Sequence, residues 1–337
     1  AGEDPARTVD YSNMLAGRIA EAIIEAASSA APANLGFATA PQPNVAFNRR
    51  YFMRDGTVAW NPGKNNPKVV KPAGPIDPNI SVLTIARESG AKPEAILTSF
   101  PLHPDTMGGT EFSGDYPHYL QEGLRSELGE PRLLSIFAQG TSGNINHVNV
   151  ASAAKQSGAG ESERIGHALA GAVAGVVPVP APALRHPSLA VVSTRIELPL
   201  QQFTPDEVAK ARADFAVIQE RKLPFLVGVR ATKIMKVIDR HHGQPIPAQV
   251  QALRLSDDAA IVMLPSELFV EFGLAIKERS PFKQTMVIEL ANDSFGYVPT
   301  RKAFEEGAYE PTNATIEPGG GERLVEAALE LLGRLRS

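Results

Sequence analysis

The sequence predicts an α/β fold, of the α+β type, in which a mixed sheet is flanked by helices within a single domain over residues 1–337. Three observations support this prediction. Segments typical of strands and of helices alternate along the chain, without an internal repeat or a clear linker. Hydrophobic residues make up 43% of the chain and charged residues 21%, as in ordinary globular proteins. A chain of 337 residues is also long enough to bury a large core.

Helices are predicted from apolar spacing and from residues that favour helix ends. Leu15 and Ile19 belong to an apolar stripe with the spacing of an amphipathic helix. Pro117 suits a first helical turn, and Asp115 is placed to cap it. Thr204 begins a capping-box pattern. The predicted helices span 11–27, 117–128, 161–177, 204–221 and 322–335.

Strands are predicted where short apolar runs end at turn residues. The run that lies between Pro131 and Gly140 is consistent with a buried strand. Two runs separated by 256–258 predict a hairpin. Residues 38–78 are rich in Pro, Asn and Gly without a sustained period, so they predict a long irregular segment, either functional or simply a surface loop. The predicted strands span 81–85, 95–100, 133–138, 189–198, 248–255, 259–264 and 286–290.

The composition excludes several classes of function. The net charge is −4 and no basic stripe exists, so nucleic acid is not expected as a partner. The chain has no cysteine, which excludes disulfides, Cys-based zinc sites and a cysteine nucleophile but leaves the compartment open. No apolar run reaches the length of a transmembrane helix. Nucleotide-binding, H-E-x-x-H and G-x-S-x-G motifs are absent as well.

Polar residues gather in loops that directly follow apolar strands, where functional residues are common. His103 follows the strand at 95–100 and is placed either to bind a metal or to be satisfied by hydrogen bonds in a tight loop. The glycines of 139–147 allow either close approach to a ligand or an ordinary turn.

Two further loops follow strands nearer the end of the chain. Glu267 is placed to act as a metal ligand or general base, although Ser266 or Glu267 could instead cap the next helix. Tyr297 and Tyr309 could bind a metal, donate a hydrogen bond to an oxyanion, or be structural. From the residues alone, the prediction stops at a soluble α/β protein, for which a hydrolase is one possible function.

Motifs in these loops occur in a fixed order that is typical of one known family. They are Asn48-Arg49, His103 followed by Ser113-Gly114-Asp115, Phe137-Ala138-Gln139, Gly143-Asn144-Ile145-Asn146-His147, Pro265-Ser266-Glu267, Tyr297-Val298-Pro299-Thr300 and Tyr309-Glu310. In this order they resemble the neutral/alkaline (non-lysosomal) ceramidase family, in particular short bacterial members with only the N-terminal catalytic domain. The resemblance extends from about residue 10 to residue 335.

The resemblance implies a zinc-dependent hydrolase that uses a metal-activated water to cleave the amide bond of an N-acyl lipid such as ceramide. It implies His103, Glu267 and Tyr297 as zinc ligands, and Arg49 and Tyr309 as groups that stabilise the oxyanion. The other implied residues are Asn146 and His147 in catalysis, with Asn48, Asp105, Asp115 and Asn144 behind the ligands or at the substrate. Asp105 or Asp115 is the expected partner that orients His103.

The chain also departs from the family. Asn144, Asn146 and His147 stand where the family has Asp, Ser and Pro, and His147 could be a new ligand or substrate contact. These changes favour an amidase or esterase that acts on a different acyl substrate as an alternative.

Neither the family's upstream His-Thr-His motif nor its C-terminal Ig-like domain is present, and the chain begins with Ala1 rather than Met. The missing histidine segment predicts either that an upstream segment is lost or supplied separately, or that the chain is a non-catalytic ligand-binding relative. The expected partners are therefore a small-molecule or lipid substrate and the protein's own upstream segment, and the resemblance implies a secreted or periplasmic location.

Overall fold

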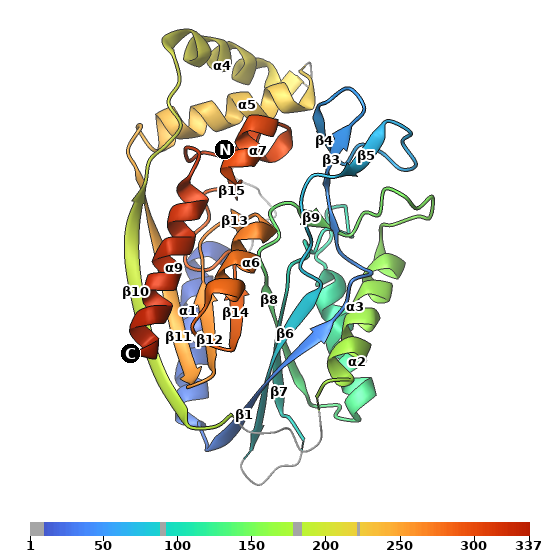
Figure 1. Cartoon of the computed structure of the whole chain (residues 1–337), viewed down its shortest axis with the longest axis vertical. Coiled ribbons are helices and arrows are strands. Elements are labelled where there is room, and N and C mark those ends of the chain that lie inside the picture. Colours follow the sequence, from blue (N-terminus) through green and yellow to red (C-terminus); the bar gives the residue numbers. More distant parts are fainter. Residues whose placement is uncertain (1–9, 88–91, 178–183, 221–222) are drawn as a thin grey trace.

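Two mixed sheets form the centre of the computed structural model, which describes residues 10–87, 92–177, 184–220 and 223–337 (Figure 1). The first sheet has the order β1-β6-β7-β8, and only its β7–β8 pair is parallel. Its strands are β1 (Ala33–Pro41), β6 (Asn79–Arg87), β7 (Ala95–Phe100) and β8 (Leu134–Gln139). The second sheet has the order β10-β11-β12-β14, and only its β12–β14 pair is parallel. Its strands are β10 (Pro187–Leu198), β11 (Ile246–Ser256), β12 (Ala259–Met263) and β14 (Gln284–Ile288).

The alternation of side chains along each strand divides the core into layers. Leu83 of β6 packs between the two sheets, in one cluster with Ile261 and Met286. Val82, its neighbour in the chain, faces away from the second sheet and packs with the helices α2 (Asp115–Leu128) and α3 (Ala159–Ala174). A third core cluster lies on the far side of the second sheet, and it includes residues of α6 (Val270–Arg279) and α9 (Gly320–Arg336). The result is a four-layer helix–sheet–sheet–helix sandwich.

The prediction of an α/β fold is confirmed, and the hairpin at 256–258 and the capping box at Thr204 are both present. The expectation of one mixed sheet is wrong, because the strands divide into two sheets that face each other. The strand at 133–138 is also not buried as expected. It is the outermost strand β8, and the side chain of Leu134 is 52% exposed.

The segment at 38–78 is more regular than the sequence predicts. It contains a three-stranded sheet of order β4-β3-β5, and its strand β2 pairs with β9 from the loop at 139–147. Strands of two to four residues between Pro, Asn and Gly turns are too short to show a period of two in the sequence. The strands are β2 (Phe47–Asn48), β3 (Arg50–Met53), β4 (Val58–Trp60), β5 (Val69–Pro72) and β9 (Ile145–Asn146).

The remaining helices cover one end of the sandwich, with α4, α5 and α7 at the top of Figure 1. The capping box begins α4, whereas α5 and the π-helix that follows it were not predicted. These helices are α4 (Pro205–Val217), the short helix η1 (Ile218–Glu220), α5 (Phe225–Met235), the π-helix η2 (Lys236–Arg240), α7 (Arg301–Glu306) and α8 (Tyr309–Asn313).

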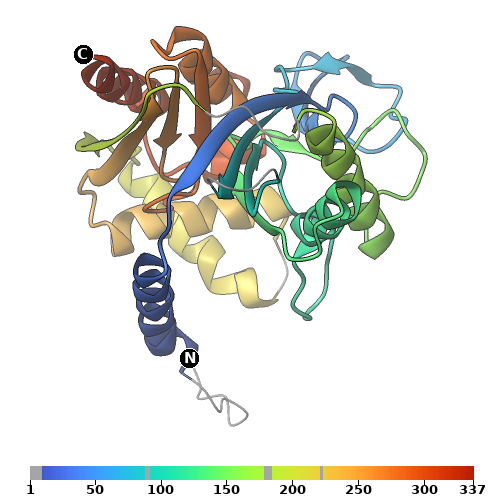
Figure 2. The same cartoon turned by 90° about the horizontal axis from the view of Figure 1, so that it is seen from below.

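The predicted N-terminal helix is present as α1 (Tyr11–Ser28) and projects from the rest of the molecule (Figure 2). Its apolar stripe is exposed, with Ile23 at 64% and Ile24 at 68%. Within the described residues, no side chain of α1 joins a core cluster. A search of the same residues for a helix long and apolar enough to cross a membrane finds none.

Candidate active site

The candidate site lies where the parallel strands of both sheets end. The loops after β7, β8, β12 and β14 meet there, and the backbone N–H of Glu289 donates to the carbonyl of Gln139 at 2.8 Å across the two sheets. A two-residue parallel ladder between β13 (Glu267–Leu268) and β15 (Tyr297–Val298) places Glu267 beside Tyr297. The carboxyl ends of parallel strands are a common place for ligand sites. Two of the expected ligands are thus neighbours by register.

The ring of His103 faces Glu267 with its Nε2 atom, and a hydrogen bond at Nδ1 determines the tautomer. Its Nδ1 lies 2.8 Å from the carbonyl oxygen of Ile145, so Nδ1 must hold the proton and donate. Its Nε2 lies 3.2 Å from Oε2 of Glu267. In the neutral ring Nε2 is an acceptor, and two acceptors at this distance require a proton or a cation between them. The His103 and Glu267 side chains are 17% and 24% exposed, so the spot they share is accessible.

The separation of these two atoms fits one edge of a zinc site. Two ligands of a tetrahedral zinc ion, each bound at about 2.0–2.2 Å, lie about 3.3 Å apart. Across the described ranges, however, no group of three His, Cys, Asp or Glu side chains is close enough to hold a metal. The imidazole and the carboxylate are side chains of the kinds that bind zinc, and the phenol of Tyr297 hydrogen-bonds to Glu267 beside them.

Burial and neighbouring charges determine the protonation of Glu267 and Tyr297. Burial alone would raise the pKa of Glu267, but the interactions with His103 and Tyr297 and the charge of Arg49 outweigh burial and lower it. Burial raises the pKa of Tyr297 well above its ordinary value, and the Glu267 carboxylate raises it further, whereas Arg49 lowers it. Without a metal, the site therefore presents an ionised Glu267 and a neutral Tyr297.

A buried ion network supports Tyr297 from behind. The guanidinium of Arg49 lies 5.2 Å from the centre of the Tyr297 ring and donates to the carbonyl of Gly143 at 2.7 Å. Glu310 is fully buried and accepts from both Arg49 Nε and Arg50 Nη1 at 2.9 Å. Arg49 is thus fixed beside Tyr297, in a position from which it could stabilise negative charge at the site.

Aromatic rings extend from the site toward α5. The ring of Tyr309 lies 5.4 Å from that of Tyr297, 4.8 Å from that of Trp60 and 5.7 Å from that of Phe225. Buried Nε1 of Trp60 has no hydrogen-bond partner among the described residues. Phe225 also lines a groove of 460 Å³ with mostly apolar walls, formed by Ile218, Leu223, Pro224, Phe225, Gly228, Val229, Thr232 and Asn313.

The glycines of 139–147 bring backbone against backbone rather than against a ligand. A Cβ on Gly140 would lie 2.8 Å from the backbone nitrogen of Pro101, just before His103. A Cβ on Gly143 would lie 2.6 Å from the carbonyl oxygen of Glu267. Contacts this short exclude any side chain. The loop is therefore pressed between the two segments that hold His103 and Glu267.

Neither Asp105 nor Asp115, the partners expected from the sequence, bonds to the ring of His103. Its ring bonds to Ile145 and Glu267, whereas the Asp105 carboxylate bonds to His147. Asp115 accepts from the backbone N–H groups of Thr106 and Met107 and from the Thr106 hydroxyl, and Gly114 occupies the N-cap position of α2. A backbone carbonyl has no signal in a sequence, which is why this partner was not predicted.

The asparagines at the site have structural partners. Asn144 accepts from the N–H of Val270 in the first turn of α6 and donates to Glu271. Asn144 therefore bonds to the start of this helix, where the sequence suggested Ser266 or Glu267 as the cap. Asn146 donates to the Asn61 side chain and accepts from the N–H of Val148. Asn48 donates to the carbonyl of Pro75 and accepts from the N–H of Arg50.

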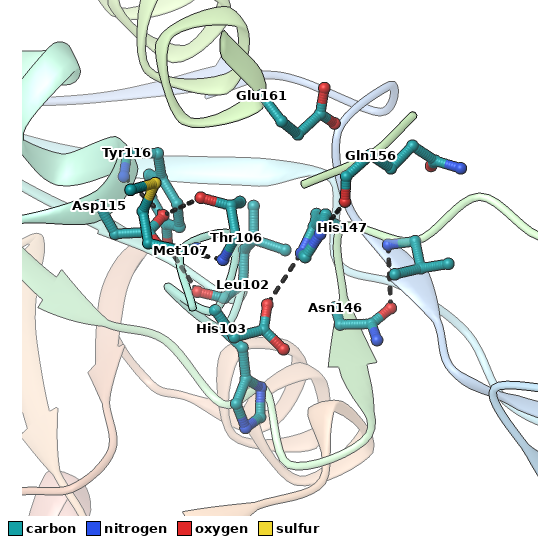
Figure 3. A network of polar contacts seen from close by, with 12 residues as sticks. Leu102, His103, Thr106, Met107, Asp115, Tyr116, Asn146, His147, Gln156 and Glu161 are labelled. Carbon is teal, nitrogen blue, oxygen red and sulfur yellow. Dashed lines mark hydrogen bonds and ion pairs between the residues drawn. The ribbon is translucent and has the colours of Figure 1, made fainter. Parts of the chain in front are cut away.

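His147 uses both ring nitrogens within the protein, and the His103 ring points away from it (Figure 3). Nε2 lies 2.9 Å from the carbonyl oxygen of Gln156 and must donate. Nδ1 lies 2.8 Å from Oδ1 of Asp105, which favours a second N–H and therefore a charged ring. The geometry does not favour His147 as a new metal ligand, because a ligand nitrogen needs a free lone pair.

The charged state of His147 predicts a pH dependence of stability. Burial would lower its pKa, but the hydrogen bond and charge of Asp105 and the Gln156 carbonyl outweigh burial and raise it. The stabilisation is complete below the unfolded pKa of about 6.5 and is lost as pH rises through the folded pKa. We expect the free energy of unfolding, measured by urea titration, to fall over that rise. His147→Gln should lack this loss, and an identical pH profile in the variant would contradict the prediction.

Comparison with protein-family models gives no match, and comparison with curated proteins also gives none. Two solved structures share the fold. A neutral ceramidase from Pseudomonas aeruginosa matches with a TM-score of 0.68 and 16% identity, over 96% of this chain and 55% of that chain. A structure described as ceramidase complexed with C2 matches with a TM-score of 0.64 and 15% identity, over 90% of this chain and 54% of that chain. This chain thus spans about half the length of the structures it matches, and the predicted resemblance is confirmed at the level of the fold.

Proposed function

We propose that the protein is a zinc-dependent hydrolase that cleaves the amide bond of an N-acyl lipid such as ceramide. One observation supports this most strongly. His103 Nε2 and Glu267 Oε2, both acceptors, lie 3.2 Å apart and face each other in a fold shared with a neutral ceramidase. His103, Glu267 and Tyr297 would hold the metal. Zinc would supply polarisation of the amide carbonyl and a water of lowered pKa.

The protein's own residues would have distinct tasks in this reaction. The carbonyl of Ile145 fixes the tautomer of His103, so that Nε2 keeps its lone pair. Arg49 and Tyr309 would stabilise the oxyanion of the substrate. The rings of Trp60, Tyr309 and Phe225, with the apolar groove beyond them, would exclude water and receive the hydrocarbon part of a lipid.

The first test is metal content and fatty-acid release, measured on the purified chain with His103→Ala and Glu267→Ala beside it. We expect about one zinc per chain in the wild type, because Nε2 of His103 and Oε2 of Glu267 form one site, and we expect both variants to lose it. Long-chain N-acyl amides should be hydrolysed, and a chelator should stop the reaction. A chain that binds no zinc after reconstitution, and yet binds lipid, would instead be a ligand-binding protein.

A second candidate is an amidase or esterase with another acyl substrate. The bonds of Asn146 to Asn61 and Val148 favour it, because they occupy a side chain that the family would use at the substrate. The same assay separates the two functions when it includes short-chain amides and esters. Faster hydrolysis of those substrates than of long-chain amides would favour the second candidate.

A further inference from the structure

We propose that Glu289 is the positioning residue that sets the separation of His103 and Glu267. It directly follows β14 and is only 2% exposed. Its two oxygens point to different segments. Oε1 accepts from the backbone N–H of Ser142 at 3.0 Å and from the Ser142 hydroxyl at 2.7 Å, whereas Oε2 accepts from the N–H of Leu268 at 2.6 Å. Leu268 is the residue next to Glu267, so one carboxylate joins the glycine loop to a candidate ligand.

The same network reaches His103 through Gln139. The Nε2 group of Gln139 donates to the Ser142 hydroxyl at 2.6 Å and to the carbonyl of Leu102 at 2.8 Å. The Ser142 hydroxyl therefore accepts from Gln139 while it donates to Glu289, an arrangement in which each bond strengthens the next. Leu102 directly precedes His103. The backbone neighbours of both candidate ligands, Leu102 and Leu268, are thus bonded to a single network.

The chemistry of the network suits a carboxylate at position 289: burial raises the pKa of this carboxyl well above its usual range, whereas the hydrogen bonds from Ser142 and Leu268 favour its ionised form. Three donors converge on the carboxylate of Glu289. Two of them, both from Ser142, bond to Oε1, and the third, the N–H of Leu268, bonds to Oε2. A glutamine has one acceptor oxygen, so its amide N–H₂ would face either Ser142 or Leu268, and two donors would meet. Unpaired buried donors are costly, so one of the two segments would move. A shift of either segment changes the distance between His103 Nε2 and Glu267 Oε2 without removing any group that touches a metal.

This inference rests on the proposed zinc site, so its test needs one readout that is independent of zinc. We would record nitrogen-15 NMR signals of the His103 ring in the metal-free full chain, and measure zinc affinity by calorimetry. In Glu289→Gln we expect the slowly exchanging Nδ1–H signal of His103 to be lost, because its bond to the Ile145 carbonyl is no longer aligned. We expect zinc affinity to fall about 10- to 100-fold, as for other partners that orient metal ligands.

The matched control is Ile234→Ala in α5, which opens a cavity in the core cluster of Ala211, Ala231, Ile234 and Met235, a cluster that contains no residue of the network. It should lose stability but keep the His103 signal and the zinc affinity of the wild type. If Glu289→Gln does not fold, Ser142→Ala replaces it, because that variant removes only the hydroxyl, with its bonds to Gln139 and Glu289, and keeps the backbone N–H on Glu289. It should weaken zinc binding and the His103 signal in the same direction.

The outcomes separate this inference from the proposed function. Unchanged His103 signals in a folded Glu289→Gln or Ser142→Ala protein would overturn the positioning role. A wild type without zinc binding would overturn the proposed function, and the His103 signals would still decide the role of Glu289.

Discussion

Replacing Glu310 with alanine is expected to lower the free energy of unfolding by about 3–5 kcal/mol, the usual cost of breaking a buried ion pair. Glu310 is fully buried and accepts from two buried guanidinium groups, those of Arg49 and Arg50. The variant would leave Arg49 with the Gly143 carbonyl, and Arg50 with the Gly307 carbonyl and Glu306. Buried Arg49 would then lose its ion-pair partner, and buried Arg50 would lose one of its two. Urea unfolding followed by circular dichroism measures the loss.

A surface pair provides the control for this experiment. Glu326 pairs with Arg279 at 2.7 Å, but its side chain is 65% exposed. Water and salt screen such pairs, so Glu326→Ala should leave the free energy of unfolding nearly unchanged. Equal losses in the two variants would mean that burial of Glu310 does not matter. Glu310→Gln keeps the shape and one acceptor, so it should fall between them.

The expected loss has a consequence for function. Arg49 lies between Glu310 and the ring of Tyr297, so its position depends on the carboxylate behind it. A folded Glu310→Gln protein should therefore keep His103 and Glu267 in place but lose part of the order at Tyr297. The network thus links stability to the aromatic side of the candidate site.

Local features of the fold were predictable from the sequence. The capping box at Thr204 and Glu207 involves residues only three apart, so the sequence contains all of its information. The hairpin between β11 and β12 has the same local character. The division into two sheets was not predictable, because it depends on which strands face each other. The contact of Leu83 with Ile261 and Met286 joins residues far apart in the chain.

The candidate site shows the same division. His103, Glu267 and Tyr297 were predicted from loops after apolar strands, and the β13–β15 ladder and the His103–Glu267 contact bring them together. Their roles as zinc ligands stay a prediction. The groups that orient them were missed, because the Ile145 carbonyl is backbone and Glu289 looks like any glutamate at a strand end. Burial, which a single sequence does not reveal, distinguishes Glu289 from the exposed glutamates.

Replacing Glu267 with glutamine is expected to lower kcat/KM on an N-acyl amide by about 10³-fold, or roughly 4 kcal/mol of transition-state stabilisation. The amide keeps nearly the same shape but loses the negative charge that faces His103 Nε2. An uncharged oxygen binds a cation weakly, so the proposed zinc site would lose one of its two strongest donors. The fold should survive, because the backbone of Glu267 is held by β15 and by the Gly296 carbonyl.

A double-mutant cycle with His103→Gln makes this prediction specific. When two residues act as one unit, removal of either one already causes nearly the whole loss of kcat/KM. The double variant should therefore be little worse than each single variant. Glu161→Gln serves as the control, because Glu161 is also buried and has an arginine partner, Arg164, but lies on α3. It should retain activity within a few fold. Additive losses would mean that His103 and Glu267 act independently, and full activity in Glu267→Gln would exclude a shared metal site.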